Sequence, residues 1–351
     1  MSAPQPPHNP HIPIRPSWLD LTQEEVLDPG QPIIDAHHHL WLQHGEPYFL
    51  NEYLADVYSG HNVIASVAVE CKAMFKKNAA PHLAPLGELE FLNGIAAMSA
   101  SGNFGDCWVA HGIVARADLT HHQSVAGVLE QYQSRAPERF KGIRISSIWH
   151  PDPSASASLA SPPQGLLMSS EFRRGFKELG PRGLSFDAWL YHTQIDEVID
   201  LASTFKDTLI IVDHMAGPNG IGPFASKRQE VFVDWQKSLK MLAACDNVRP
   251  KLGGMGMKVF GFDFHEKPTP PTSDLLSEHW APYIHACIET FGVERCMFES
   301  NFPVDKGSYS YGVMWNAFKK TVARYSPREK NSLFFNTANE TYRLGFSRLS
   351  A

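Results

Sequence analysis

Short apolar runs alternate with amphipathic segments along most of the chain. Eight of these runs have the length and the composition of buried strands. They cover residues 32–36, 62–70, 108–115, 140–146, 184–190, 207–214, 247–253 and 295–300. Strands that alternate with helices form βαβ units with parallel pairing, and eight such units close into a barrel. The pattern therefore predicts an α/β fold, a distorted (β/α)8 TIM barrel over residues 31–351.

Three of the intervening helices have ends that can be read from the sequence. Thr193 is predicted to cap a helix whose apolar positions between Ile195 and Phe205 follow a helical period. The apolar stripe from Trp280 to Phe291 is expected to stop at Gly292. Residues 326–329, Ser-Pro-Arg-Glu, have the cap, the first-turn proline and the returning glutamate of a helix start.

The predicted loops after the second, fourth, sixth and seventh strands are long. They cover residues 71–88, 147–170, 214–228 and 253–276. In a β/α barrel such loops emerge at the carboxyl ends of the strands, where active sites are assembled. Within them, residues 151–165 are a candidate lid or a tolerated insertion, and residues 253–264 either close over a flat ring or form a surface or subunit contact. Residues 1–30, rich in proline at their start, are predicted to form an extended arm or a disordered tail.

Composition narrows the class of protein. The chain has no apolar run near the length of a membrane span, and its first residues lack the apolar core of a secretory signal. A net charge of −6 without a basic block argues against nucleic acid as a partner. The five cysteines are scattered and lack CxxC spacing, which favours reduced thiols and a cytoplasmic location. These features leave a small molecule as the expected partner, and they leave open whether the chain pairs into a homodimer.

Polar and ionisable residues follow most of the predicted strands. They are His37 and His39, Glu70, Arg144, Tyr191 and His192, Asp213 and His214, Lys251, and Glu299, Ser300 and Asn301. The carboxyl ends of parallel strands meet at one rim, so these side chains are expected to converge there. His37 and His39 are two residues apart and should point to the same side of an extended chain, where they can share a metal ion or grip a substrate. The alternatives are a histidine-rich loop for this motif and a helix-start role for His192.

The motifs DAHHHLW, KGIR, IIVDHMAGP and CMFESNFPVD resemble those of the amidohydrolase superfamily, in particular its lactonase-like branch. The resemblance covers roughly residues 30–345. It implies a distorted β/α barrel with the active site at the strand ends. It also implies functional roles for His37, His39 and His214, with Arg144 and Lys251 as anion-binding positions.

One position departs from the family pattern. Families of this kind usually carry an aspartate after the eighth strand, and here Asn301 occupies that place. An amide cannot act as a general base. Another residue therefore supplies the base, the reaction needs no such base, or the protein binds without turnover. Candidate replacements are Glu70, His192, His214, Glu299 and Asp305, of which His214 and Glu70 rank first. His37, His39 and His214 could hold one divalent metal ion, with zinc the expected one, whereas some members of this branch work without metal.

The leading hypothesis is a hydrolase that opens a lactone or related ester of a small carboxylated compound. In this hypothesis Arg144 and Lys251 hold the substrate carboxylate, and Tyr191 and His192 contribute to substrate binding. Asn301 orients the water, and His214 or Glu70 accepts its proton. The first alternative is a non-oxidative decarboxylase or hydratase of an aromatic or unsaturated acid on the same scaffold. The second is a non-catalytic binding protein, which the missing aspartate permits.

Overall fold

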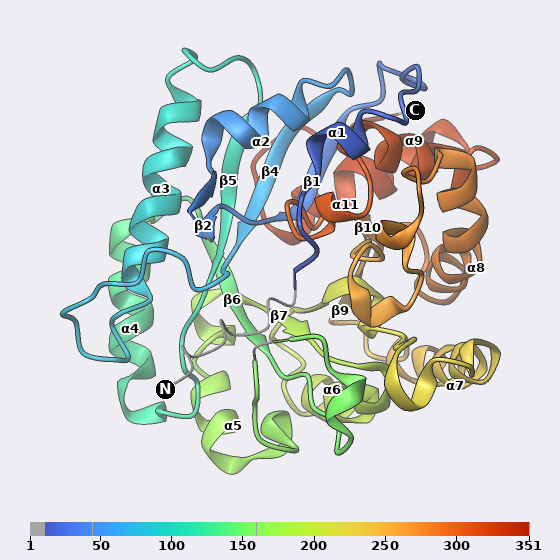
Figure 1. The fold of residues 1–351 in the computed structure, drawn as a ribbon. Coiled ribbons are helices and arrows are strands. Elements are labelled where there is room, and N and C mark those ends of the chain that lie inside the picture. Colours follow the sequence, from blue (N-terminus) through green and yellow to red (C-terminus); the bar gives the residue numbers. More distant parts are fainter. Residues whose placement is uncertain (1–10, 44, 159, 351) are drawn as a thin grey trace, which may run out of the picture.

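Eight parallel strands pair in chain order around the barrel (Figure 1). The structure is a computed structural model, and it describes residues 11–43, 45–158 and 160–350. The barrel strands are β1 (Ile33–His38), β4 (Val63–Val69), β5 (Trp108–Ala115), β6 (Phe140–Ser146), β7 (Ser185–Trp189), β8 (Ile210–Val212), β9 (Val248–Leu252) and β10 (Met297–Phe298). Each overlaps one of the eight predicted runs, so the predicted fold class is confirmed. Strands β2 (Trp41–Gln43) and β3 (Glu46–Tyr48) form a small antiparallel hairpin after β1.

The ring closes through the residues that directly follow β10. The backbone N–H of Asn301 donates to the carbonyl of His37 at 2.9 Å, and the N–H of His39 donates to the carbonyl of Phe302 at 2.7 Å. This closure has a functional consequence, because it places Asn301 beside the histidines at the end of β1.

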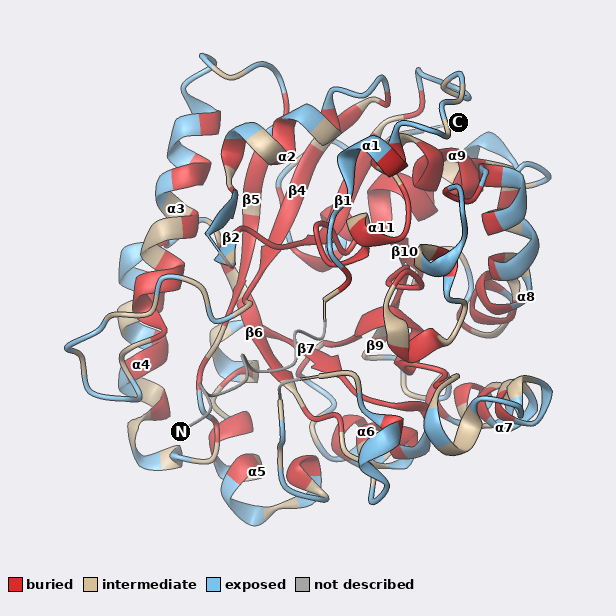
Figure 2. Cartoon of the chain, in the orientation of Figure 1, coloured by how far each residue is buried: buried red, intermediate tan, exposed pale blue. Residues whose placement is uncertain are grey.

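The strands are apolar because both of their faces are covered. Figure 2 shows buried residues along the strands, whereas the surrounding helices have an exposed outer face. Strands that are buried on two sides read as nearly continuous apolar runs instead of alternating ones. Several ionisable residues interrupt these runs, and two of them, Asp187 in β7 and Lys251 in β9, are fully buried. Such groups require partners inside the barrel.

Helices connect the strands and cover the barrel. They are α1 (Pro16–Leu19), α2 (Leu50–Val57), α3 (Leu86–Ala100), α4 (His122–Arg135), α5 (Ser170–Phe176), α6 (Ile195–Thr204), α7 (Arg228–Leu242), α8 (Ser273–Phe291), α9 (Tyr311–Thr321), α10 (Pro327–Asn331) and α11 (Thr337–Thr341). None of the helices in the described part of the chain is long and apolar enough to cross a membrane.

Two of the three predicted helix ends are confirmed and one is wrong. Gly292 ends α8, and Ser326 caps α10 with Glu329 returning the second hydrogen bond. Thr193 does not cap α6, because it lies inside a short 3-10 turn and Gln194 is the residue before the helix. The Gln194 side chain instead accepts the backbone N–H of Trp149 at 2.9 Å, which ties this turn to the loop after β6.

The four long loops follow the strands predicted for them, with two boundaries changed. Helices α3 and α8 begin at Leu86 and Ser273, a few residues before the predicted ends of their loops. Residue 159 of the candidate lid and residues 1–10 of the predicted arm lie outside the described residues. From residue 11 onward the arm crosses the barrel and contains the short helix α1 (Figure 1).

Candidate active site

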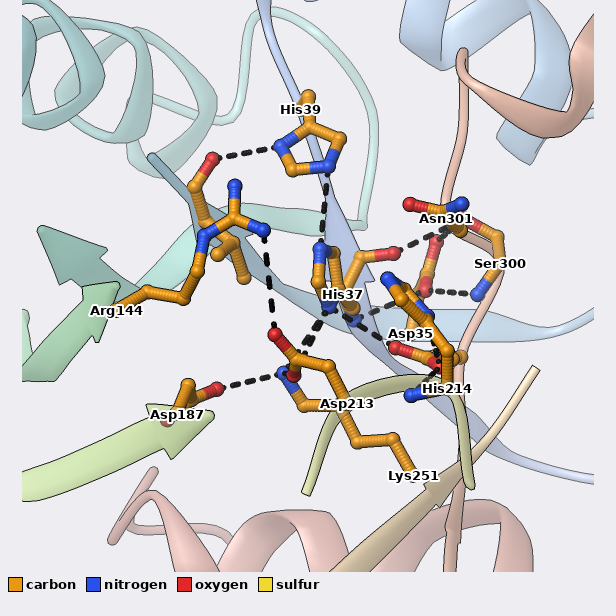
Figure 3. A network of polar contacts seen from close by, with 12 residues as sticks. Asp35, His37, His39, Arg144, Asp187, Asp213, His214, Lys251, Ser300 and Asn301 are labelled. Atoms are coloured by element: carbon orange, nitrogen blue, oxygen red, sulfur yellow. Dashed lines mark hydrogen bonds and ion pairs between the residues drawn. The ribbon is translucent and has the colours of Figure 1, made fainter. Parts of the chain in front are cut away.

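Three histidines from two strand ends form one cluster (Figure 3). The ring of His37 lies 4.8 Å from the ring of His39 and 4.8 Å from the ring of His214, between centroids. His38 points to the other side, where it stacks on Tyr53 at 4.0 Å. The HxH motif therefore sends two imidazoles to one side of the chain, and the third arrives from the end of β8, far away in the sequence.

Each of the three imidazoles has its Nδ1 atom beside an oxygen acceptor. Nδ1 of His39 lies 2.9 Å from the carbonyl of Val69. The Glu299 carboxylate serves the other two, at 2.9 Å from Nδ1 of His37 and 2.6 Å from Nδ1 of His214. A proton on Nδ1 satisfies each acceptor and leaves the Nε2 lone pair for a ligand, which is how metal-binding and proton-accepting histidines are oriented.

Backbone strain positions His214. His214, Met215 and Ala216 all have left-handed conformations, with φ of 52°, 55° and 60°. For residues other than glycine this costs about 1–2 kcal/mol each, and such strain is concentrated at functional sites. The contacts that hold it include the N–H of His214 on Glu299 and the close approach of Gly254, where a Cβ atom would lie 2.4 Å from Nδ1 of His214. Gly254 is therefore required by the imidazole that it faces.

A buried ion network lies beneath the histidines. The ammonium group of Lys251 is 2.7 Å from Asp187, 3.1 Å from Asp213 and 3.2 Å from Nδ1 of His37. Tyr342, from the C-terminal segment, donates to Asp187 at 2.6 Å. The structure thus places Lys251 in a fully buried network and, among the described residues, outside the lining of the cavity. This position differs from the predicted one on a substrate carboxylate.

The network sets the charge states around the cluster. Burial alone would raise the pKa of Asp213, but Lys251 and His37 hold it well below its usual value. Burial likewise opposes ionisation of Glu299, yet His214 and His37 lower its pKa to about 2. Burial lowers the pKa of His214, with Glu299 opposing that shift. At neutral pH the site therefore presents ionised carboxylates behind a neutral His214.

A cavity of about 220 Å³ opens above the cluster. Among the described residues, its charged lining side chains are Glu70, Lys72, Arg116, Arg144 and Lys258. Glu70 is bound by Nε of Arg144 at 2.7 Å and approached by Arg116 at 3.7 Å. The cavity thus carries a surplus of positive charge, which favours an anionic occupant.

Most of the predicted site residues line this cavity, but His192 lies elsewhere. Those that line it are His39, Glu70, Arg144, Tyr191, His214 and Asn301, accompanied by aromatic and aliphatic side chains that include Trp41 and Trp189. The Tyr191 hydroxyl is 3.3 Å from the hydroxyl of Ser156 in the loop after β6. His192 turns away and lines a separate hollow between α6 and α7, where its Nδ1 accepts the N–H of Asn219. The structure does not bring His192 to the histidine cluster.

The amide orientation of Asn301 is fixed by its neighbour Asp305. Nδ2 of Asn301 donates to Asp305 at 2.8 Å, and Asp305 also accepts the N–H of Gly256 at 2.9 Å and the hydroxyl of Tyr309. Because the NH2 group faces Asp305, the amide oxygen is the atom left to accept a hydrogen bond in the cavity. Burial raises the pKa of Asp305 to about 7, against these hydrogen bonds, which lower it.

Replacement of Asn301 with aspartate is expected to lower the free energy of unfolding by about 1–3 kcal/mol at pH 8. Two carboxylates would then stand where a hydrogen bond now joins Asn301 to Asp305, so one of them has to keep a proton. Burial already raises the pKa of Asp305 to about 7, and a second carboxylate raises it further, so the folded variant keeps a proton that the unfolded chain releases. Its stability should therefore fall more between pH 5 and pH 8 than that of the wild type. Urea unfolding between pH 5 and pH 8 measures this dependence.

The double variant Asn301→Asp with Asp305→Asn is the matched control. It exchanges acid and amide and keeps one donor and one acceptor between positions 301 and 305, so it should recover most of the lost stability at pH 8. A loss of stability between pH 5 and pH 8 that is no larger in the single variant than in the wild type would contradict the assignment of Asp305 as the partner of Asn301.

The sequence prediction missed two members of this arrangement. The sequence offers Glu299 only as a replacement base, whereas in the structure it is the carboxylate that orients two of the three histidines. Asp187 is absent from the predicted site, although an acid inside the apolar run LSFDAWL is a signal of a buried ion pair. His37, His214 and Glu299 also bring potential ligand atoms within 4.8 Å of one another, which makes them a candidate metal site.

A barrel of parallel strands with this cluster at their carboxyl ends defines an enzyme of the TIM-barrel class. Residues 34–344 match the amidohydrolase family, and the chain belongs to that family. An uncharacterized protein of Sinorhizobium fredii, y4mH, is 34% identical over 334 residues, which cover 89% of this chain and 98% of that protein. The L-fucono-1,5-lactonase of Burkholderia ambifaria is 29% identical over 137 residues, 38% of this chain and 41% of that enzyme.

A solved structure shares the fold. It is a crystal structure of an amidohydrolase from Burkholderia multivorans with bound zinc, and it matches with a TM-score of 0.66 at 19% identity, covering 89% of this chain and 99% of that one. The resemblance to amidohydrolases that the sequence motifs suggested is thereby confirmed at the level of family and fold.

Proposed function

We propose that this chain hydrolyses a lactone, or a related ester, of a small carboxylated compound. The observation that carries the proposal is the cavity itself. It combines a positive charge surplus with two tryptophans and opens directly on His39, His214 and Asn301. Guanidinium groups bind carboxylates through paired hydrogen bonds, and Arg144 and Arg116 stand on one side of the cavity around Glu70. The name of the lactonase relative supports the same reaction class.

The attacking water needs an acceptor for its proton, and His214 is suited to that role. Glu299 accepts the Nδ1 proton of His214 at 2.6 Å, which leaves Nε2 as the basic atom. The same carboxylate stabilises the imidazolium once the proton has been taken, as in a Ser-His-Asp triad. Asn301 contributes its amide oxygen, which can accept a hydrogen bond from the water and orient it.

A divalent metal ion, with zinc the expected one, is the alternative occupant of the cluster. The three buried residues whose potential ligand atoms all lie within 4.8 Å of one another are His37, His214 and Glu299, and His39 adjoins this group through His37. Nε2 of His37 is 3.1 Å from Nε2 of His39, and Zn–N bonds of 2.0–2.1 Å at tetrahedral angles place two ligand nitrogens about 3.3 Å apart. When bound, the ion would polarise the carbonyl and acidify a water molecule. Glu70 is then the proton acceptor that remains in the cavity lining, while Arg144 and Tyr191 hold the substrate.

The test is a screen of lactones in pairs that differ only by a carboxylate, such as an aldono-1,5-lactone and the corresponding aldaro-1,5-lactone, in which a carboxylate replaces the terminal CH2OH group. Acid release in a pH-stat should give kcat/KM at least tenfold higher for the carboxylated member. The variant Lys258→Gln should reduce this preference while leaving hydrolysis of the uncharged lactone unchanged. Elemental analysis of the purified protein accompanies the screen. CO2 release from aromatic acids without lactone hydrolysis, or tight binding without turnover, would overturn the proposal.

A further inference from the structure

We propose that the N-terminal arm is a wall of the active-site cavity and that Ile12 limits the size of the molecule that enters it. The arm is residues 11–30 of the described chain. His11 and Ile12 line the same cavity as His39, His214 and Asn301, although 25 residues or more separate them from these residues in the sequence.

Ile12 is held in place on the side away from the cavity. It is 5% exposed, and it packs on Gly307 in the loop after β10. A Cβ atom on Gly307 would lie 2.6 Å from the Cβ, Cγ2 and carbonyl oxygen of Ile12. Only a glycine leaves room for this close approach, so the position of Ile12 is set by contact with the barrel.

His11 extends the wall toward the histidine cluster. Its ring lies 4.9 Å from the ring of Trp41, and Trp41 in turn stacks parallel to His39 at 6.0 Å. The arm is therefore linked to His39 of the histidine cluster by a single residue between them, Trp41. A change in the position of the arm alters the space next to His39.

The rest of the arm is tied to the loop that forms the neighbouring wall. Trp18 donates to the carbonyl of Lys267 at 3.1 Å, Thr22 donates to that of Pro270 at 2.9 Å, and Glu24 accepts the N–H of Ser273 at 2.7 Å. The same loop, between β9 and α8, supplies Lys258 and its two neighbours to the cavity lining. Arm and loop thus form one continuous boundary of the cavity.

Cys71 provides a measurement that does not require a known substrate. Cys71 belongs to the cavity lining. Cys245, in the loop between α7 and β9 and in contact with α6, is a second partly exposed thiol outside that lining. Modification of each thiol by N-ethylmaleimide and by a bulky maleimide can be followed by mass spectrometry. The ratio of the two Cys71 rates reports the size of the opening, and Cys245 reports reagent reactivity.

Two variants open the wall by different means. Ile12→Gly removes the side chain, and Gly307→Ala displaces it from behind. Both should raise the Cys71 rate with the bulky reagent at least tenfold relative to Cys245, with a smaller change for N-ethylmaleimide. Leu21→Gly, at a 61% exposed position of the arm, is the control and should leave both rates unchanged. Unchanged Cys71 rates in both variants, with wild-type thermal unfolding, would overturn the proposal whether or not the chain is a lactonase.

Discussion

Replacement of His214 with asparagine is expected to lower kcat for lactone hydrolysis by about 10²- to 10⁴-fold, the usual contribution of a positioned general base. Asparagine retains a polar group near Glu299 but has no basic nitrogen to accept the proton of water. The backbone contacts that hold the strained residues 214–216 stay in place, namely the N–H of His214 that donates to Glu299 and the indole N–H of Trp235 that donates to the carbonyl of Met215. Steady-state kinetics and elemental analysis on the same preparation measure the effect.

The matched control is His279→Asn, because His279 is an exposed histidine of α8 outside the cavity lining. It should keep the wild-type rate. Loss of activity with unchanged metal content would assign His214 to proton transfer, and loss of both would assign it to metal binding. Wild-type turnover by the His214 variant would remove the histidine cluster from the mechanism.

The barrel could be predicted because its strands are buried on both faces. Because of this burial, every strand lies in a mostly apolar stretch of the sequence, including β8 and β10, which are only three and two residues long. Strand ends were harder to predict, because a strand ends where its hydrogen bonds end and the apolar run continues beyond that point. The prediction of Thr193 as a cap is wrong because a tertiary contact shapes this turn. The Gln194 side chain accepts the backbone N–H of Trp149, and the local sequence does not encode that contact.

The sequence also predicts that the site residues converge on one rim. It does not predict which of them face the cavity and which lie in the buried network. Parallel strands bring their carboxyl ends to one rim, and this alone places His37, His39 and His214 together. Whether a rim residue faces the cavity or the barrel interior depends on its height along the strand and on the turn that follows it. Lys251 lies within β9 and points into the buried network, and the 3-10 turn after β7 carries His192 to another hollow.

The arm shows a different limit of the sequence. Residues 11 and 12 precede the first barrel strand and carry no motif, and their place is fixed by Gly307, close to the other end of the chain. Ile12 and Gly307 are separated by almost three hundred residues in the sequence, so their contact leaves no local periodicity that could be detected. The resemblance to amidohydrolases could not supply it either, because that resemblance begins at about residue 30.

Replacement of Lys251 with methionine is expected to lower the free energy of unfolding by about 3–5 kcal/mol at pH 7, because removing one member of a buried ion network leaves the others uncompensated. Lys251 is fully buried, and its ammonium group is the cation between Asp187 and Asp213. Burial opposes its charge, but these two carboxylates raise its pKa, so the wild-type lysine stays protonated over the whole range of the measurement. Urea unfolding followed by circular dichroism gives the difference.

The pH dependence of this effect has a defined sign. In the wild type, Lys251 and His37 hold the pKa of Asp213 well below its usual value, so its contribution to stability is complete above about pH 4. Without the lysine, burial raises that pKa, and the folded variant takes up protons that the unfolded chain does not hold. The destabilisation should therefore be larger at pH 8 than at pH 5. Lys237→Met, at an exposed position of α7, should change stability by less than about 0.5 kcal/mol at both values. If the Lys251 variant is as stable as the wild type at pH 8, Asp187 and Asp213 are neutral in the folded protein. The charge states assigned to the histidine cluster would then be wrong.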